Sequence, residues 1–296
     1  MSAVQQKQKQ WKLIDLLNWT ADYLADKGFE NGRLETERLL AHSLNLRRID
    51  LYVNFDRPLI PEELSHFKTL LKRRLEHEPL QYILGETEFY SLPFKVAPGI
   101  LIPRPETEIL VDQVRDVCAE VPENETIHIL DVGTGSGCIA IACAHNIPNA
   151  EITAVDISEQ ALEIAQQNAE LNGVAEKITF FQQDALNEWK TEYHQKFDVI
   201  VSNPPYISAA EYEKLDDEIK NFEPKNALIA GEKGLDFYHN FLFQLKNLLK
   251  PNGFVLFEIG ETQAESISGF YSSNGYETEI IKDLADKDRI LKIKGV

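Results

Sequence analysis

Residues 127–137 are, in order, Ile127-His128-Ile129-Leu130-Asp131-Val132-Gly133-Thr134-Gly135-Ser136-Gly137. The apolar run at 127–132 predicts a buried strand, because it is short and bounded by a turn. The glycines that follow allow a tight bend and a close approach of the backbone to a ligand. An apolar helix is predicted next, at 138–145. The segment therefore predicts a strand, a ligand-binding turn and a helix.

Strands and helices alternate along the rest of the C-terminal two thirds of the chain. Further strands are predicted at 151–155, 178–182, 197–202 and 254–259, with helices at 105–118, 158–172 and 235–249. The final segments, 276–281 and 289–294, predict an antiparallel closing pair. Such alternation predicts an α/β fold, with a Rossmann-like, mostly parallel sheet covered by helices on both faces.

The N-terminal part of the chain has helical periodicity instead. Amphipathic segments at 11–27, 34–46 and 61–84 predict a small helical bundle, with a proline at position 61 well suited to a first helical turn. The basic run Lys72-Arg73-Arg74 is interpreted as a solvated helix face. We expect three parts: a helical substrate-recognition domain at 1–84, a β-hairpin linker at 85–102, and a catalytic domain at 103–296.

The charge of the chain is unevenly distributed. Residues 1–84 hold 13 Lys and Arg against 12 Asp and Glu, whereas residues 85–296 hold 17 against 36, and the whole chain has a net charge of −18. Affinity for nucleic acid comes largely from Lys and Arg contacts to phosphates. An acidic C-terminal part therefore counts against a polyanionic partner, and no direct nucleic-acid contact is expected.

Other compositional features favour a cytoplasmic protein. No apolar run approaches the roughly 20 residues of a membrane-spanning helix, and the polar residues 1–10, interpreted as a frayed lead-in, are unlike a secretory signal. The three cysteines, Cys118, Cys138 and Cys143, lack Cys-x-x-Cys spacing. They are expected to be small buried side chains in a reducing compartment. The seven histidines show no metal-ligand spacing.

Polar residues follow the predicted strands where a parallel sheet gathers its ligand-binding groups. Asp156 ends the second strand, Asp184 closes the third, and Asn203 closes the fourth. A carboxylate at 156 can accept from both ribose hydroxyls, and one at 184 can reach an adenine amino group. The Gly-x-Gly-x-Gly turn is shorter than a dinucleotide fingerprint. The set fits a nucleoside with a small charged tail, such as S-adenosylmethionine.

The fourth strand runs into Asn203-Pro204-Pro205-Tyr206. Prolines lack an N–H and hold the chain extended, so this arc is rich in hydrogen-bond acceptors. It suits a planar –NH2 group, which has two donors to satisfy, and the Tyr206 ring can cover the flat face of that group. An ordinary Pro-Pro turn after a strand is the alternative.

Four further motifs carry a family resemblance: Gly85-Glu86-Thr87-Glu88-Phe89, Leu101-Ile102-Pro103-Arg104-Pro105-Glu106-Thr107-Glu108, the Asn-Pro-Pro-Tyr arc and Phe222-Glu223-Pro224-Lys225-Asn226-Ala227-Leu228. With the glycine turn, they make the chain resemble class I S-adenosylmethionine-dependent methyltransferases. Specifically, it resembles the protein-glutamine methyltransferases of the PrmC/HemK family over nearly its whole length. The Asn-Pro-Pro-Tyr motif is shared with adenine and cytosine amino-methyltransferases, so the Ile-Pro-Arg-Pro-Glu-Thr-Glu run and the helical N-terminus are more specific.

The resemblance implies a reaction and the residues that perform it. The implied substrate is the glutamine of the Gly-Gly-Gln motif in class 1 peptide chain release factors, with S-adenosylmethionine as cofactor and a monomeric enzyme. Asn203, Pro204 and Tyr206 are the implied catalytic residues, and Pro205 joins them in binding substrate. The implied cofactor-binding residues are Gly133, Thr134, Gly135, Ser136, Gly137, Asp156, Asp184, Ala185 and Asn203. Ala185 departs from relatives with an aromatic residue at that position.

Three alternatives stay open. One is a glutamine methyltransferase that acts on a ribosomal protein. A second is an adenine amino-methyltransferase that acts on nucleic acid, because an adenine –NH2 offers the same two donors; methyl incorporation that survives nuclease treatment would discriminate against it. The third is a non-catalytic nucleoside-binding or assembly module, which the absence of methyl transfer would favour.

Overall fold

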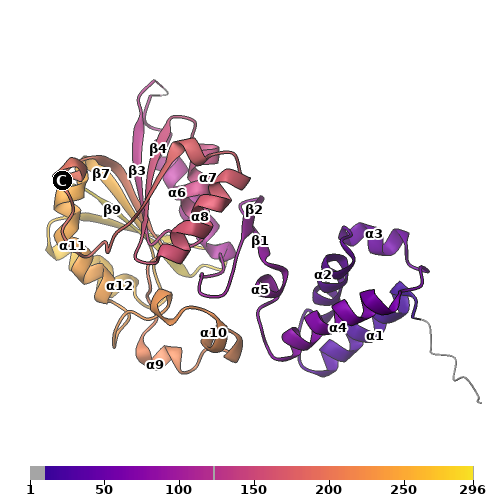
Figure 1. The fold of residues 1–296 in the computed structure, drawn as a ribbon. Helices are drawn as coiled ribbons and strands as arrows, with labels where there is room; N and C mark the ends of the chain where they lie inside the picture. Colours follow the sequence, from indigo (N-terminus) through magenta and orange to yellow (C-terminus); the bar gives the residue numbers. More distant parts are fainter. Residues whose placement is uncertain (1–10, 123, 296) are drawn as a thin grey trace, which may run out of the picture. The chain divides into compact units, whose positions relative to one another are not determined.

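A computed structural model describes residues 11–122 and 124–295. It divides into two compact units, the first ending at Leu84 and the second beginning at Gly85, coloured in chain order in Figure 1. The predicted lead-in at residues 1–10 lies outside the described residues. The predicted 85–102 segment falls within the second unit, where it contains the two-stranded hairpin of β1 (Glu86–Phe89) and β2 (Leu92–Lys95). Its role as a linker stays a prediction.

The first unit consists of helices, as its periodicity predicts. They are α1 (Leu13–Asp26), α2 (Gly32–Leu44), α3 (Arg48–Val53), α4 (Pro61–Leu75) and α5 (Leu80–Leu84). The helical region predicted at 61–84 is interrupted between α4 and α5. There His77 adopts a left-handed φ of 62° and Pro79 cannot continue a helix. The apolar side chains of these helices form one core.

The basic run on α4 is only partly a solvated face, because the interpretation was wrong for Arg74. Arg74 is 5% exposed, donates to the Glu35 carboxylate of α2 at 2.6 Å, and lies 4.5 Å over the Phe29 ring. Arg73 donates to Glu78 at 2.7 Å. The Lys72 side chain is the most exposed of the three, at 78%. The reason is the packing of α4 against α2, which the local charge pattern does not reveal.

The second unit is built on a seven-stranded sheet with the order β5-β4-β3-β6-β7-β9-β8. All neighbouring strands pair in parallel except that β9 runs antiparallel to both β7 and β8, which confirms the predicted sheet. The strands are β3 (Ile127–Val132), β4 (Ala150–Asp156), β5 (Ile178–Gln182), β6 (Phe197–Ser202), β7 (Leu249–Glu258), β8 (Glu277–Lys282) and β9 (Asp288–Lys294).

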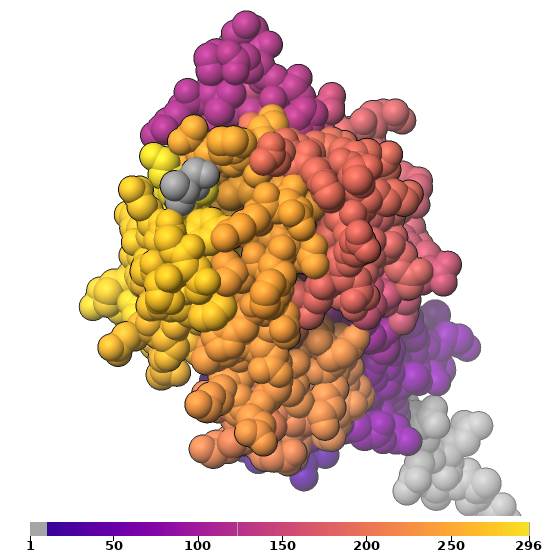
Figure 2. Space-filling view, turned by 90° about the vertical axis from the view of Figure 1, so that its left-hand side faces the viewer, coloured from indigo at the N-terminus to yellow at the C-terminus, as the bar shows by residue number. Residues whose placement is uncertain are grey.

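Helices cover both faces of this sheet, as Figure 1 shows. The core on one face takes in side chains of α6 (Glu108–Cys118), α7 (Cys138–Asn146) and α8 (Glu159–Leu171), and the core on the other those of α11 (Asp236–Leu248) and α12 (Ala264–Ser273). The orange and yellow segments from α11 to β9 form one continuous surface in Figure 2. The remaining elements are η1 (Pro105–Thr107), η2 (Ala175–Lys177), η3 (Thr191–Tyr193), α9 (Ala209–Tyr212), α10 (Asp217–Phe222) and η4 (Lys225–Ala227).

One predicted boundary is wrong. The strand predicted at 254–259 begins at Leu249, directly after α11 ends at Leu248. Phe197 of β6 pairs with Leu249 and Val199 pairs with Phe254, so residues 250–253 bulge out of the ladder between these pairs. Residues 251–253, Pro-Asn-Gly, lie between the predicted helix at 235–249 and the predicted strand at 254–259, but in the structure they belong to this bulge inside β7.

All three cysteines are buried free thiols in the second unit, which confirms their predicted burial. Burial raises the pKa of Cys118 and of Cys138 to about 12, and raises that of Cys143 well above its usual range. The thiolate is the reactive form of cysteine, so these side chains are inert packing groups. Across residues 11–122 and 124–295, none of the helices combines the length and the apolarity needed to cross a bilayer.

The Arg74 contact predicts an asymmetric response to substitution along α4. In Arg74→Ala the Glu35 carboxylate loses a largely buried partner, so we expect the free energy of unfolding of the first unit to fall by about 3–5 kcal/mol. Lys72→Ala, on the same helix but exposed, should change it by no more than about 0.5 kcal/mol. Urea unfolding measures both in a Trp189→Phe background, where the fluorescence comes from Trp11 and Trp19 of the first unit alone. Equal losses in the two variants would contradict the buried contact.

Candidate active site

A cavity of about 390 Å³ lies at the carboxyl ends of the central strands. Here β3 sits between β4 and β6, where the strand order reverses and α/β folds bind their ligands. Its wall is formed by Gly99, Ile100, Leu101, Ile102, Pro103, Arg104, Thr107, Val132, Gly133, Thr134, Gly135, Ser136, Cys138, Ile139, Asp156, Ile157, Ser158, Ala161, Gln183, Asp184, Ala185, Leu186, Asn203, Pro205, Pro224, Asn226, Ala227 and Phe237.

The glycine turn forms one side of this cavity with its backbone. Gly133 has a left-handed φ of 70°, and a Cβ added there would meet no atom within 4 Å, so the turn leaves open space for a ligand. Gly137, with a φ of 82°, does not line the cavity. A Cβ there would come within 3.0 Å of Ala165 on α8, so its role is close packing of the turn against that helix.

The side chains of the turn face inward more than toward the cavity. The Thr134 hydroxyl donates to Asp131 Oδ2 at 2.7 Å, and the Ala140 amide donates to the same oxygen at 3.2 Å. Asp131 is fully buried and its other oxygen has no hydrogen-bond partner among the described residues. Burial therefore raises the pKa of Asp131 to about 7. The Ser136 side chain is 2% exposed.

Asp156 lies where the sequence predicts it, at the end of β4 on the cavity wall. Its Oδ2 accepts from the Gly135 amide and its Oδ1 accepts from the Ser158 amide, both at 2.9 Å. Burial raises its pKa, and these two amides oppose that shift. A carboxylate has about four acceptor sites, so both oxygens retain lone pairs for ligand hydroxyls.

Asp184 also borders the cavity, but its carboxylate caps the local turn, accepting from the Leu186 amide and the Asn187 side chain, each at 3.0 Å. The predicted contact of Asp184 with an adenine amino group stays a prediction. The neighbouring Ala185 lines the cavity, whereas Trp189 lies behind it. The Trp189 ring is 3% exposed and its Nε1 donates to the Ala185 carbonyl at 3.1 Å.

The Asn203-Pro204-Pro205-Tyr206 arc divides the main cavity from a smaller one of about 170 Å³. Pro205 lines the main cavity, Pro204 and Tyr206 line the smaller one, and Asn203 lines both. Neither Asn203 Oδ1 nor the Pro204 carbonyl accepts a hydrogen bond from the residues that the structure describes. The predicted acceptor-rich arc thus has two free acceptors where the cavities meet.

The arc is held in place from behind by the segment that precedes α11 and by α12. The Gln263 side chain donates to the Tyr206 carbonyl at 2.8 Å and to the Gly234 carbonyl at 3.2 Å. Gly234 has a φ of 71°, and a Cβ there would lie 2.1 Å from the Tyr206 carbonyl oxygen. Only glycine fits this close approach, so the position fixes the arc against movement away from the cavities.

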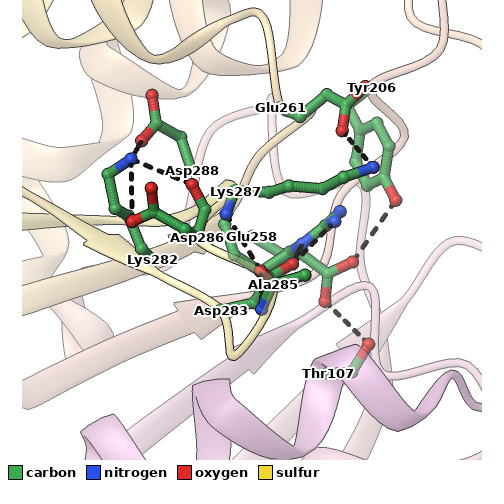
Figure 3. Close-up of polar contacts among 11 residues, drawn as sticks. Thr107, Tyr206, Glu258, Glu261, Lys282, Asp283, Ala285, Asp286, Lys287 and Asp288 are labelled. Carbon is green, nitrogen blue, oxygen red and sulfur yellow. Dashed lines mark hydrogen bonds and ion pairs between the residues drawn. The ribbon is translucent and has the colours of Figure 1, made fainter.

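Sequence reasoning missed a buried carboxylate behind the arc. Glu258, at the end of β7, is 1% exposed and accepts from the Thr107 hydroxyl at 2.7 Å and from the Tyr206 hydroxyl at 3.3 Å, as Figure 3 shows. Burial raises its pKa, and the Thr107 hydrogen bond and Arg289 oppose that shift. A lone charged residue inside the apolar run 254–259 was the available signal.

Other wall residues also escaped prediction. Arg104 donates to the Glu223 carboxylate, and the Ile102 amide donates to it at 3.4 Å, which ties the segment before η1 to the loop after α10. Ile157, directly after Asp156, is 59% exposed although it is apolar. Phe89 does not reach the cavity and is buried against Phe94.

The residues present fit a nucleoside ligand. Gly133 leaves open space beside the turn, Asp156 offers acceptors for hydroxyl groups, and the exposed Ile157 offers an apolar surface for a flat ring. In the part of the chain that the structure describes, no three His, Cys, Asp or Glu side chains are grouped so as to hold a metal ion.

The burial of Asp131 predicts a specific pH dependence of stability. Its folded pKa of about 7 lies above its usual value of 3.8, so the protonated form stabilises the fold at low pH and this contribution is lost as pH rises through about 7. In Asp131→Asn an amide oxygen still accepts from Thr134 and Ala140. The free energy of unfolding of the wild type should therefore fall relative to this variant between roughly pH 4 and 7, by up to about 4 kcal/mol.

Urea unfolding of both proteins at a series of pH values, without added ligand, measures this difference. A difference that stays constant across the range would contradict the raised pKa.

Two family models match parts of the chain. The family description "PrmC N-terminal domain" matches residues 15–85, and "Methyltransferase small domain" matches residues 107–220. A release factor glutamine methyltransferase from Geobacter sulfurreducens is 44% identical, with 92% of each chain covered. One from Chlorobaculum tepidum is 38% identical, with 96% of this chain and 97% of the relative covered.

Among solved structures, the hMettl16 catalytic domain in complex with MAT2A 3′UTR hairpin 6 matches with a TM-score of 0.54 and 16% identity, covering 80% of this chain and 84% of that one. This likeness supports the methyltransferase fold alone. The relatives from Geobacter sulfurreducens and Chlorobaculum tepidum match the chain along both of its units, with at least 92% of each sequence covered. The chain is therefore an S-adenosylmethionine-dependent methyltransferase and belongs to the release factor glutamine methyltransferase family.

Proposed function

We propose that this enzyme methylates the side-chain amide nitrogen of the glutamine in the Gly-Gly-Gln motif of class 1 peptide chain release factors. One observation carries the proposal: Asn203 Oδ1 and the Pro204 carbonyl are free acceptors at the meeting point of two cavities. Two acceptors suit the two hydrogens of a primary amide. The names of the relatives support glutamine in a release factor as its source.

The larger cavity is proposed to hold S-adenosylmethionine. When bound, this cofactor supplies a methyl group that its positive sulfonium activates. The backbone of the glycine turn, from Gly133 to Ser136, would lie against the ligand, and Asp156 would accept from the ribose hydroxyls. Asp184 and Ala185 lie at the wall proposed for the adenine.

The smaller cavity is proposed to receive the glutamine side chain. Apolar side chains line it, among them Leu101, Ile207, Ile219 and Leu228, and they suit the methylene groups of an uncharged chain. Tyr206 also lines it, so its ring can pack on the amide plane. Burial raises the pKa of Tyr206 above its usual range, so the phenol stays neutral and serves as a packing and hydrogen-bonding group.

The residues of the arc act mainly by orientation. An amide nitrogen is a poor nucleophile because its lone pair is delocalised into the carbonyl. Asn203 and Pro204 hold its two hydrogens and thereby aim the nitrogen at the methyl group, and such orientation can supply ~7–11 kcal/mol in favourable cases. The same two oxygens stabilise the positive charge that grows on the nitrogen as the bond forms. No general base is required, because the methylated cationic amide is strongly acidic.

Two alternatives share the same geometry. A ribosomal-protein glutamine offers the same amide, and an adenine –NH2 offers the same two donors. The uneven charge counts against nucleic acid, since residues 85–296 hold 36 Asp and Glu against 17 Lys and Arg. A cytoplasmic location follows from a substrate that acts in translation. The monomeric state and the absence of direct nucleic-acid contact stay predictions.

The function is tested with labelled S-adenosylmethionine and a purified release factor. Mass spectrometry should map the label to the glutamine of the Gly-Gly-Gln motif, and incorporation should survive nuclease treatment. Label on a ribosomal protein but not on the release factor would favour the first alternative, and nuclease-sensitive label would favour the second. No transfer to any of these would favour a non-catalytic module.

Asn203→Ala should nearly abolish methyl transfer while leaving cofactor binding intact. The variant removes one of the two acceptors that orient the nitrogen, and we expect kcat to fall roughly 10²–10³-fold, as when a transition-state hydrogen bond is lost. Asn274→Ala, an exposed asparagine after α12, is the matched control and should retain wild-type turnover. Calorimetry with S-adenosylmethionine checks binding. Substantial turnover in Asn203→Ala would contradict the assignment.

Asp156→Asn should weaken cofactor binding instead. It removes the negative charge from a group proposed to accept from ribose hydroxyls, and hydrogen bonds to charged groups are worth about 1.5–3 kcal/mol, so we expect the dissociation constant to rise roughly 10- to 100-fold. Glu159→Gln, an exposed acidic residue at the start of α8, is the control. Titration calorimetry measures both. Unchanged affinity in Asp156→Asn would remove the residue from the cofactor site.

A further inference from the structure

We propose that Glu258 and Thr107 are positioning residues that orient the Asn203 side-chain amide, so that its oxygen faces the incoming amide group of the substrate. This inference rests on the proposed function, because it takes Asn203 Oδ1 as an acceptor of a substrate hydrogen. The residues act in series: Glu258 sets the direction of the Thr107 hydroxyl, and that hydroxyl sets the direction of the Asn203 amide.

The first step of this relay is fixed by the buried carboxylate. Glu258 Oε2 lies 2.7 Å from Thr107 Oγ1 in a buried position, and Figure 3 shows the carboxylate between the hydroxyls of Thr107 and Tyr206. In this hydrogen bond the Thr107 hydroxyl is the donor and the Glu258 carboxylate oxygen is the acceptor. The single hydroxyl hydrogen of Thr107 therefore points toward Glu258.

The second step follows from the first. With its hydrogen committed, Thr107 Oγ1 can only accept from its other neighbour, Asn203, whose side chain must present its –NH2 group. Asn203 Nδ2 lies 3.1 Å from Thr107 Oγ1, in agreement with this order. An asparagine amide can adopt two orientations related by a flip, and its hydrogen-bond partners decide between them. Because Asn203 Nδ2 donates to Thr107, the Oδ1 atom of Asn203 faces away from Thr107.

The orientation of the Asn203 amide matters because the flipped orientation could not bind the amide group of the substrate. If the amide flipped, Asn203 would present an –NH2 group to the –NH2 group of the substrate, and neither could accept from the other. The three residues come from η1, β7 and the end of β6, so Thr107 is 151 residues from Glu258 and 96 from Asn203 in the chain. The sheet brings them together, and no short motif contains the set.

Thr107 offers the sharpest test. Thr107→Val preserves the shape of the side chain but removes the hydroxyl, so the Asn203 –NH2 group loses the acceptor that fixes its orientation. We expect kcat to fall roughly 10- to 100-fold. This is less than the roughly 10²–10³-fold fall expected when a transition-state hydrogen bond is lost outright. KM for the release factor and the affinity for S-adenosylmethionine should stay close to wild type. Thr107→Ser keeps the hydroxyl and should restore kcat to within roughly 3-fold of the wild type.

A double-mutant cycle distinguishes a relay from two separate structural contacts. Glu258→Met removes the acceptor while filling its volume, and it should lower kcat at least as much as Thr107→Val, because it also leaves the Tyr206 hydroxyl without its acceptor. Because the residues act in series, the double variant should be no slower than the slower single variant. Multiplying losses would overturn the relay, and so would wild-type kcat in either single variant.

Ser202→Ala is the matched control for loss of a buried hydroxyl beside the site. Ser202 precedes Asn203, is fully buried, and donates to the Val132 carbonyl at 2.7 Å, outside the relay. This variant should lose about 1 kcal/mol of stability with little change in kcat. A fall in kcat equal to that of Thr107→Val would show that any buried defect at this strand end has the same effect, and would overturn the positioning role.

A second measurement examines the relay without any turnover. In ligand-free, nitrogen-15-labelled protein, the Asn203 side-chain resonances are assigned by their absence in Asn203→Ala. They should shift in Thr107→Val and in Glu258→Met and return in Thr107→Ser. Resonances that do not move would overturn the relay even if the wild type methylates a release factor. Wild-type failure to methylate a release factor counts against the proposed function alone, since the resonances still test the relay.

Discussion

Parallel pairing of β3 with β4 on one side and β6 on the other is the constraint on which the site depends. Strands paired in this way end at the same edge of the sheet, so the residues that follow each strand meet there although they lie far apart in the chain. The glycine turn after β3, Asp156 at the end of β4 and Asn203 after β6 all gain their positions from this register.

The fold was largely predictable because its signals are local. Short apolar runs and glycine or proline punctuation indicated the strands, and the alternation with helices indicated the parallel sheet. Errors occurred where tertiary pairing overrode a local signal. The Pro251-Asn252-Gly253 turn is an ordinary helix terminator in sequence, yet β6 pairs with residues on both sides of it and makes it a bulge within β7.

The site was predictable only in part, for a related reason. Residues that follow strands could be placed together from topology alone, and the cavity contains most of them. The groups behind them could not. Glu258 accepts a hydrogen bond from Thr107, which is 151 residues away in the chain. Arg104 donates to Glu223, which is 119 residues away. Arg74 shows the same limit in the first unit, where a basic run suggested solvent exposure and a distant glutamate and phenylalanine ring determined burial.

The buried thiols of the second unit allow its transient opening to be measured by chemical modification. Among them, Cys138 lines the cavity. A thiol reagent can modify Cys118 and Cys143 only after the surrounding core separates, because burial protects them sterically and keeps them protonated. Labelling rates in the native protein thus report the transient opening of the methyltransferase unit. After Trp189, the one tryptophan of that unit, is replaced by phenylalanine, the fluorescence of Trp11 and Trp19 reports on the helical unit. The two units then carry separate signals, so the opening of one and the unfolding of the other can be followed in the same protein.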